Sequence, residues 1–127
     1  MLVDYNTRKS APDATIRRMA EQDTGYAVVL TTAGSEEQAE AIARTLVERR
    51  LAACVNVAPQ IKSFYRWKGK VVEDEETLLV IKTEAALFDR LREAIREIHS
   101  YEMPDILLIP VAAGDPAILD WITESVG

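Results

Sequence analysis

Residues 53–83 decide the fold, and they read ACVNVAPQIKSFYRWKGKVVEDEETLLVIKT. The first part, Ala53 to Tyr65, is rich in the β-branched and aromatic residues that favour strands. Trp67-Lys68-Gly69-Lys70 then supplies the glycine that a tight turn requires, and Val71 to Thr83 returns as the partner strand. The stretch therefore predicts a long central hairpin.

The returning strand carries the clearest burial signal in the chain. Thr77-Leu78-Leu79-Val80-Ile81 contains no charged residue, whereas a strand with one face in water alternates apolar and polar residues. We therefore expect this segment to be a central strand that is covered on both faces.

On the N-terminal side of the hairpin, a strand and a helix are predicted. Tyr26 to Thr31 is a short apolar run, and Ser35-Glu36-Glu37-Gln38 matches the capping box that starts a helix. Apolar residues then recur at three- and four-residue spacing, which predicts a stripe facing a sheet. The stripe consists of Ala39, Ile42, Ala43, Leu46 and Val47.

On the C-terminal side, the pattern predicts a helix, a strand and a second helix. The first helix runs from Ala85 to about His99, with an inner stripe of Leu87, Leu91, Ala94, Ile95 and Ile98. Ile106 to Ala112 is the last long strand. Asp115-Pro116, a capping residue followed by proline, starts a short terminal helix.

The predicted order is strand, helix, strand, strand, helix, strand, followed by an extra C-terminal helix. This order indicates an α/β (α+β) protein with a ferredoxin-like βαββαβ sandwich and a long central hairpin. In that topology the second and fourth strands lie at the sheet edges. Pro59 and Pro110 fall in those two strands, where a missing backbone N–H is tolerated.

Length and composition indicate one soluble domain. The 127 residues are 48% hydrophobic and 28% charged, which is too apolar for a disordered chain. We expect a flexible N-terminal extension over residues 1–24, which can include a short helix from Ala14 to Gln22, and a domain over residues 25–127. The net charge of −6 and the lack of a basic cluster argue against nucleic acid as a partner.

The cellular location follows from the cysteine count and the N-terminus. Cys54 is the only cysteine, so no internal disulfide forms. The N-terminus lacks the continuous apolar stretch of a signal peptide or a membrane helix. We therefore expect a cytoplasmic protein with no membrane partner.

Four segments carry a family resemblance, in order and at similar spacing: Arg50 to Asn56, Tyr65 to Lys70, Lys82-Thr83 and His99 to Pro104. They resemble the CutA family of divalent-cation tolerance proteins, and the likeness spans about Tyr26 to Val126. The resemblance implies a ferredoxin-like protomer in a tight homotrimer, associated with copper or other divalent metal ions. The family usually has proline and glutamate where this chain has Ser100 and Asp105.

The candidate metal ligands are His99, Glu102, Cys54 and Asp105. Imidazole is the commonest transition-metal ligand, but His99 also lies at a predicted helix end, where it can cap carbonyl groups. A Cys54 thiolate suits Cu(I), although burial as a small apolar residue is the commoner fate of a free cysteine.

The carboxylates near His99 have two interpretations as well. Glu102 and Asp105 can complete an oxygen and nitrogen site or stay solvated on a loop. One histidine and one cysteine are too few for a closed zinc site. Any site is therefore open and weak, holding Cu(II) or another divalent ion, or it recruits residues from a neighbouring subunit.

The hairpin itself carries aromatic and charged residues. Phe64, Tyr65 and Trp67 suit a subunit contact, since large aromatics are enriched in interfaces, or else a cluster within their own chain. The run Glu73 to Glu76 resembles a cation site, but successive carboxylates of a strand point to opposite faces, so the run forms at best two pairs. A solvated edge or a subunit contact is the favoured interpretation of this run.

Two functions remain open at this point. The first is a homotrimeric protein that binds metal ions and responds to them. The alternative is a trimeric signalling or scaffold module similar to PII proteins, in which Arg66, Lys68 and Lys70 meet a phosphate, although no P-loop occurs. The chain is not expected to be an enzyme, because it has one histidine and no Gly-x-Ser-x-Gly motif.

Overall fold

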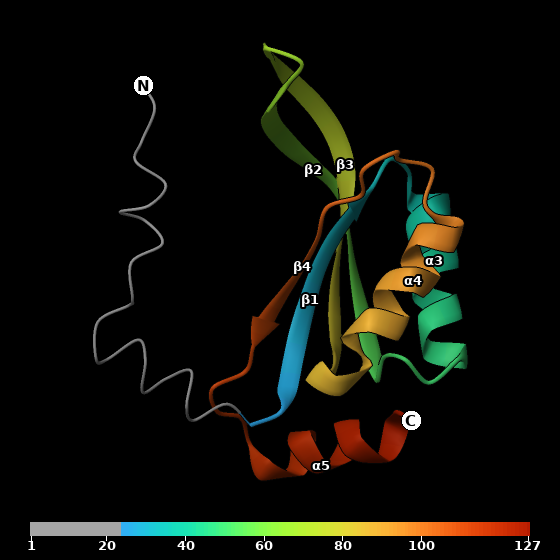
Figure 1. Cartoon of the computed structure of the whole chain (residues 1–127), viewed down its shortest axis with the longest axis vertical. Helices are drawn as coiled ribbons and strands as arrows, with labels where there is room; N and C mark the ends of the chain where they lie inside the picture. The colour runs from blue at the N-terminus through green and yellow to red at the C-terminus, as the bar shows by residue number, and fades with distance from the viewer. Residues whose placement is uncertain (1–23) are drawn as a thin grey trace.

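The computed structural model describes residues 24–127, so the expected extension and its helix from Ala14 to Gln22 lie outside the described residues. The strands and helices follow one another in the predicted order, which confirms the ferredoxin-like fold (Figure 1). The elements are β1 (Tyr26–Ala33), α3 (Glu36–Glu48), β2 (Cys54–Trp67), β3 (Lys70–Glu84), a 3-10 turn (Ala85–Leu87), α4 (Phe88–Ile98), β4 (Ile106–Pro110) and α5 (Pro116–Ser125).

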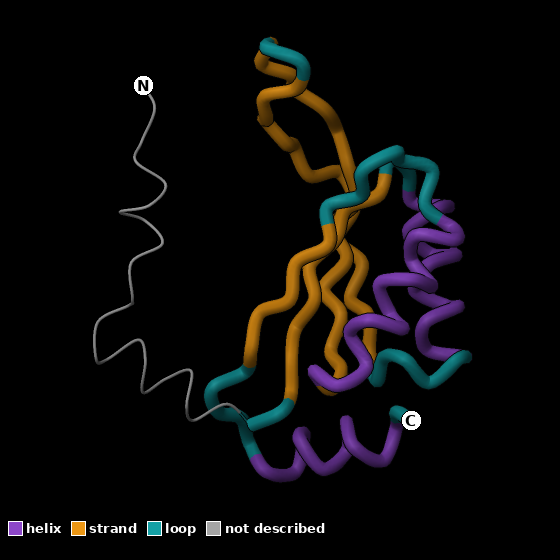
Figure 2. The backbone as a smooth tube through the Cα atoms, viewed as in Figure 1, coloured by secondary structure: helices purple, strands orange, loops and turns teal. Residues whose placement is uncertain are grey.

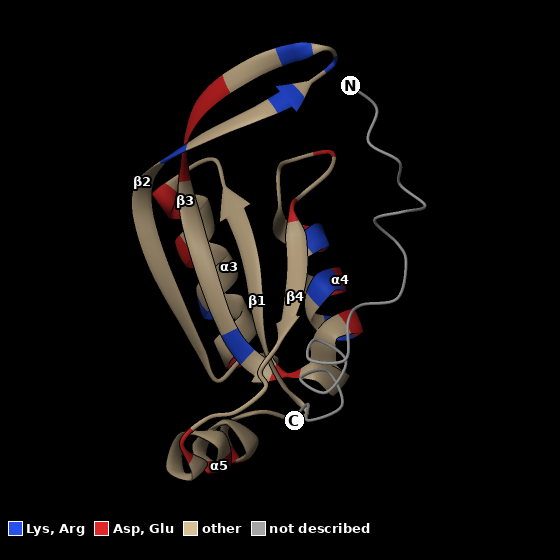
Figure 3. Ribbon diagram, turned by 90° about the vertical axis from the view of Figure 1, so that its left-hand side faces the viewer, with Lys and Arg blue, Asp and Glu red and all other residues tan. Residues whose placement is uncertain are grey.

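The four strands form one antiparallel sheet with the order β2-β3-β1-β4 (Figure 3). Figure 2 shows the strands in orange and the helices in purple. β2 and β4 are therefore the edge strands, as predicted, and they contain Pro59 and Pro110 respectively. β1 lies inside the sheet, paired with β3 on one side and with β4 on the other.

Local capping chemistry fixes the helix starts. The Ser35 side chain accepts a hydrogen bond of 3.2 Å from the Gln38 backbone N–H at the start of α3. Asp115 does the same for Ala117 at 2.9 Å, with Pro116 in the first turn of α5. Both predicted N-termini are confirmed. None of the helices described within residues 24–127 is long and apolar enough to cross a membrane.

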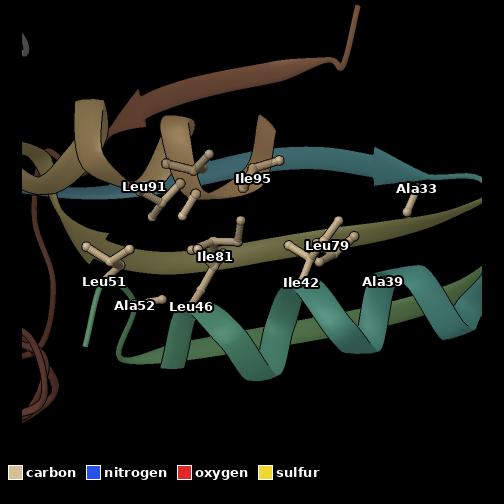
Figure 4. Close-up of a cluster of buried hydrophobic side chains, with 12 residues drawn as sticks. Ala33, Ala39, Ile42, Leu46, Leu51, Ala52, Leu79, Ile81, Leu91 and Ile95 are labelled. Carbon is tan, nitrogen blue, oxygen red and sulfur yellow. The ribbon is translucent and has the colours of Figure 1, made fainter. Parts of the chain in front are cut away.

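The core lies between one face of the sheet and the pair α3 and α4 (Figure 4). Alternate residues of β1 and β3 point into it and meet apolar side chains of both helices. The largest of these fully buried side chains are Val29, Leu79, Ile81, Ile42, Leu46, Leu91 and Ile95. Burying each one contributes about 1.5 to 3 kcal/mol to folding.

The predicted stripe of α3 is correct except at its C-terminal end. Ala39, Ile42 and Leu46 are buried, but Ala43 is only partly buried and Val47 is exposed. The buried stripe is therefore narrower than the apolar pattern in the sequence.

The second face of the sheet carries no helix within residues 24–127, because α3 and α4 lie on the same side and α5 lies across one end (Figures 1 and 3). This open face consists of Val28, Leu30, Thr32, Cys54, Asn56, Ala58, Leu78, Val80, Lys82, Leu107 and Ile109. Leu78 and Val80 are not fully buried there, so the expectation that β3 is covered on both faces is wrong for the single chain.

The hairpin of β2 and β3 projects beyond the rest of the sheet (Figure 1). Its turn residues, Lys68 and Gly69, have φ values of 50° and 80°, the left-handed pair that suits a two-residue hairpin turn. Near its base the pairing shifts between Ala58 and Ile61, and Gln60 there has a φ of 58°. The shift is a β-bulge, which increases the local twist and bends the arm.

Candidate functional site

The sequence points first to His99, which caps the C-terminal end of α4 and is buried, with 8% of its surface exposed. Its Nε2 lies 2.6 Å from the Thr32 carbonyl oxygen, and its Nδ1 accepts a 3.1 Å hydrogen bond from the Tyr101 backbone N–H. A neutral imidazole has one donor and one acceptor, so this pattern places the proton on Nε2. Both ring nitrogens are thus engaged, and they tie α4 to the end of β1.

Tyr101 extends this network to the base of the hairpin. Its ring packs against the His99 ring at a centroid distance of 4.6 Å, and its hydroxyl donates a 2.8 Å hydrogen bond to Glu76 Oε2. The phenol also lies over Gly34, where a Cβ atom would be only 3.2 Å from the Tyr101 oxygen. Gly34 therefore allows the close approach that joins the loop after α4 to β3.

The acidic residue of this network is Glu76, which is only 7% exposed. Burial raises the pKa of Tyr101, and so do the hydrogen bond and the charge of Glu76. The phenol therefore keeps its proton and remains a donor to the carboxylate at neutral pH. On the hairpin, the hydrogen bond that Tyr65 donates to Asp74 likewise raises the pKa of Tyr65.

A polar hollow of about 200 Å³ lies beside Glu76, between the base of the hairpin and the start of α3. We call it the acidic hollow. Its lining consists of Gly34, Ser35, Glu36, Gln60, Glu75, Glu76 and Thr77. Its lining includes acidic, amide and hydroxyl residues, and Glu75 and Glu76 are successive residues of β3, so their side chains point to opposite faces of the sheet.

Sequence reasoning missed most of this hollow. The run Glu73 to Glu76 was the one available signal, and Glu75 and Glu76 line the hollow. Gln60 enters it because of a β-bulge, and Tyr101 reaches Glu76 across 25 positions of sequence. Neither arrangement follows from local periodicity.

The two predicted loop carboxylates, Glu102 and Asp105, lie after His99 on the loop that leads to β4. Both are exposed, and neither makes a hydrogen bond or an ion pair with another residue of the range 24–127. Their oxygen atoms are therefore accessible from solvent, in contrast to the engaged nitrogens of His99.

Cys54 lies elsewhere, on the open face, where its Sγ is 3.9 Å from Asn56 Oδ1. The thiol is half-buried, so the favoured burial holds only in part, and Cys54 shares the open face with Asn56. Cys54 pairs with Lys82, which pairs with Val28, four residues from Thr32 along β1. At about 3.3 Å per residue, the thiol lies about 13 Å along the sheet from the His99 contact.

The four predicted ligands are thus not gathered into one site by a single chain. Within residues 24–127, no group of three or more His, Cys, Asp or Glu side chains is arranged to hold a metal ion. A metal ion on one chain would meet at most a partial set of ligands, such as the loop carboxylates.

Comparisons with known proteins place these features in a family. The CutA1 family model, described as CutA1 divalent ion tolerance protein, matches residues 27–125. A Divalent-cation tolerance protein CutA from Thermus thermophilus is 50% identical over 100 residues, which cover 79% of this chain and 97% of that protein. A mouse Protein CutA is 49% identical over 98 residues, which cover 75% of this chain and 55% of the mouse protein. The chain thus spans about half the length of the mouse relative.

Solved structures agree with the fold. The structure of a divalent cation tolerance protein, Cut A1, from Thermus thermophilus has a TM-score of 0.79 at 49% identity, over 80% of this chain and 99% of that one. A structure from Archaeoglobus fulgidus, described as a periplasmic divalent cation tolerance protein CutA, has a TM-score of 0.78 at 42% identity, over 80% and 99% of the two chains.

Proposed function

Because this chain belongs to the CutA1 family of divalent ion tolerance proteins, we propose that it acts as a homotrimer that binds copper or another divalent metal ion weakly and takes part in the response to such ions. The family is named for tolerance and not for a reaction, and the proposed role is non-enzymatic. The observation that carries the proposal is the open apolar face of the sheet.

The open face supports self-association because it leaves large apolar side chains in solvent. Leu107 and Ile109 of the edge strand β4 are 59% and 48% exposed. Through the sheet register they continue across Leu30 and Val28 toward Val80 on β3. An extended apolar patch of this kind marks an interaction surface on a soluble protein.

The hairpin supports the same conclusion. Phe64, Tyr65 and Trp67 are exposed on an arm that no other element covers within residues 24–127 (Figure 1). β2 and β4 also have one edge each without a strand partner among the described residues. Contacts between subunits would cover the aromatic side chains and remove the aggregation hazard of bare edges.

For the metal, the proposed first contacts are Glu102 and Asp105, since their carboxylates are exposed and unengaged among the described residues. His99 joins them only if one of its two hydrogen bonds is released, which lowers the affinity. Cys54 belongs to the open face, so its thiol would meet residues of neighbouring subunits. Such sites are open and weak, as a partial set of ligands implies.

Calorimetric titration of Cu(II) and Zn(II) into metal-free protein tests the metal proposal. Glu102→Gln combined with Asp105→Asn keeps the shape of the loop and removes two charges. We expect this variant to bind at least tenfold more weakly, a loss of about 1.4 kcal/mol. Glu40→Gln with Glu93→Gln, on exposed positions of α3 and α4, is the control for the lost charge, because neither carboxylate makes an ion pair within residues 24–127.

Saturable binding that is weakened only in the loop variant would support the proposal. Absence of saturable binding in the unmodified protein would contradict it and favour the trimeric signalling or scaffold module. Titration with nucleotides would then test whether the basic hairpin tip binds a phosphate. We also propose a cytoplasmic location, which fractionation of cells expressing the full chain tests directly.

A further inference from the structure

The helix α5 covers one end of the sheet and packs on an apolar cluster of its own (Figure 1). The main core, between the sheet and the helices α3 and α4, contains no residue of α5. We call the separate group the end cluster. It consists of Ala53, Leu87, Ile122 and Val126, with Tyr26 partly buried beside it. Because the two clusters share no residue, the loss of α5 from the end cluster leaves the main core intact.

The helix α5 has few buried side chains. Ile122 is its one buried residue, and Val126, directly after the helix, is the second apolar anchor. Ile118 and Trp121 of the same helix are 45% and 42% exposed. An isolated helix of this length is unstable in water, and burial of one side chain within it contributes little. Its position therefore depends strongly on polar contacts.

Arg50 makes the most extensive of these polar contacts. Its guanidinium group donates a hydrogen bond of 2.9 Å to the Glu124 carbonyl oxygen and one of 3.1 Å to the Gly127 carbonyl oxygen. The Gly127 N–H donates a bond of 2.9 Å to the Arg50 carbonyl oxygen in return. A cation at this position also suits the negative C-terminal end of the α5 dipole.

A second polar contact lies one turn earlier in α5. The Thr123 hydroxyl donates a 3.2 Å hydrogen bond to a carboxylate oxygen of Glu84 at the end of β3, and it accepts one from the Tyr26 hydroxyl. These side-chain contacts and those of Arg50 lie at the surface, where water can replace each partner. The attachment of α5 is thus more easily lost than the packing of the main core.

Arg50 occupies a backbone position at which glycine is the usual residue. It follows α3 with a φ of 58°, in the left-handed region. Its N–H bonds to the Val47 carbonyl oxygen and the Leu51 N–H bonds to that of Leu46, which is the Schellman pattern that ends a helix. Any side chain with a Cβ atom is disfavoured there. The contacts of the guanidinium group with α5 offset this strain.

We propose that residues 116–127, which we call the end strap, release from the sheet as a unit while the main core stays folded, and that Arg50 is the clamp that limits this release. The released state exposes the apolar side chains of Ala53 and Leu87. The end strap therefore determines whether this end of the sheet is an apolar surface or a covered one. The inference concerns a single chain and does not rest on the proposed homotrimer or metal site.

Amide hydrogen exchange of the full chain, followed by NMR, separates local opening from global unfolding. In the unmodified protein, the amides of the end strap should exchange about tenfold faster than those of Leu79 and Ile81 in the central strand β3. Arg50→Gly is the most informative variant, because glycine suits the turn after α3 but lacks the clamp. We expect it to accelerate exchange in the end strap by a further factor of about ten, with exchange at Leu79 and Ile81 unchanged.

The sign of this effect separates the clamp from a role in the turn alone. If Arg50 served only the turn, glycine would improve the end of α3 and exchange in the end strap would not rise. Arg50→Lys is a second variant that keeps the charge but replaces the fork of donors with one ammonium group. It should give an intermediate rate of exchange in the end strap.

Arg49→Ala, compared with Arg50→Ala, is the matched control. Arg49 is the neighbouring arginine, and its ion pair is with Glu97 on α4 and not with α5. Circular dichroism establishes that every variant is folded. Exchange in the end strap that Arg50→Ala and Arg50→Gly leave unchanged, or that Arg49→Ala raises equally, overturns the inference. Exchange at Leu79 and Ile81 that rises in step with the end strap also overturns it, because α5 would then open only with the main core.

Discussion

The two faces of the single sheet differ in how completely the residues of one chain cover them. On the covered face, Leu79 and Ile81 are fully buried beneath α3 and α4, so one chain completes that side of the fold. On the open face, the side chain of Val80 stays half-buried, and Leu107 on β4 is exposed. The same uninterrupted apolar run of β3 thus serves folding on one face and, in our account, assembly on the other.

The largest effect is expected from truncating the covered face. Leu79→Ala removes a side chain with no solvent exposure and leaves a cavity, so the free energy of unfolding should fall by about 3 kcal/mol. Leu107→Ala is the matched change on the open face. Its effect should depend on protein concentration, because it acts through association. Urea unfolding at several protein concentrations measures the stability of both variants. If Leu107→Ala lowered the free energy of unfolding equally at every concentration, the proposed difference between the two faces would be contradicted.

The next effect concerns the connection between the body and the hairpin. Tyr101→Phe leaves the buried Glu76 carboxylate without its donor and should cost about 1.5 kcal/mol. Tyr65→Phe removes the comparable bond to Asp74 on the exposed hairpin and should cost clearly less, because water replaces the lost donor there. Thermal or urea unfolding of the two variants under one set of conditions gives the comparison. Equal losses would show that the Tyr101 bond is no more important than a surface contact.

A smaller effect is expected at the start of α3, next to the acidic hollow. Ser35→Ala deletes the side-chain oxygen that caps the Gln38 N–H, so stability should fall by about 1 kcal/mol. Ser35→Asp restores an acceptor at that position and should recover most of the loss. Unfolding curves that are identical for the unmodified protein and Ser35→Ala would contradict the role of the cap.

Most of the architecture was predictable because it depends on local patterns. Periodicity identified α3 and α4, and the Trp67 to Lys70 segment identified the turn. The order of the elements predicted the edge strands, and Pro59 and Pro110 agreed with that prediction. Each signal lies within a few residues of the feature that it predicts.

The site was predictable only in part, because its contacts join distant positions. His99 was found as the sole histidine, but its bond to Thr32 spans 67 positions and engages the nitrogen that a metal ion would need. No periodic pattern in the sequence indicates the bond between Tyr101 and Glu76. The same holds for the bulge that brings Gln60 to the hollow.

The smallest effect is a dependence on alkaline pH. The pKa of Tyr101 is raised above its ordinary value of 10.0 by burial and by Glu76. A raised pKa in the folded state contributes stability that is complete below about pH 10 and is lost as the pH rises toward the folded-state pKa. Above about pH 10 the unmodified protein should therefore lose stability more steeply than Tyr101→Phe. Urea unfolding at a series of alkaline pH values measures the two slopes, and parallel curves would contradict the link to Glu76.

If the open face joins three copies of the chain, the protein in solution has the mass of a trimer, which light scattering coupled to size exclusion measures. We expect a mass three times that of one chain for the unmodified protein. For Leu107→Asp, which places a charge on the exposed apolar patch, we expect a folded monomer. A monomeric unmodified protein, or a Leu107→Asp variant that remains a stable trimer, would show that the open face does not hold a trimer together.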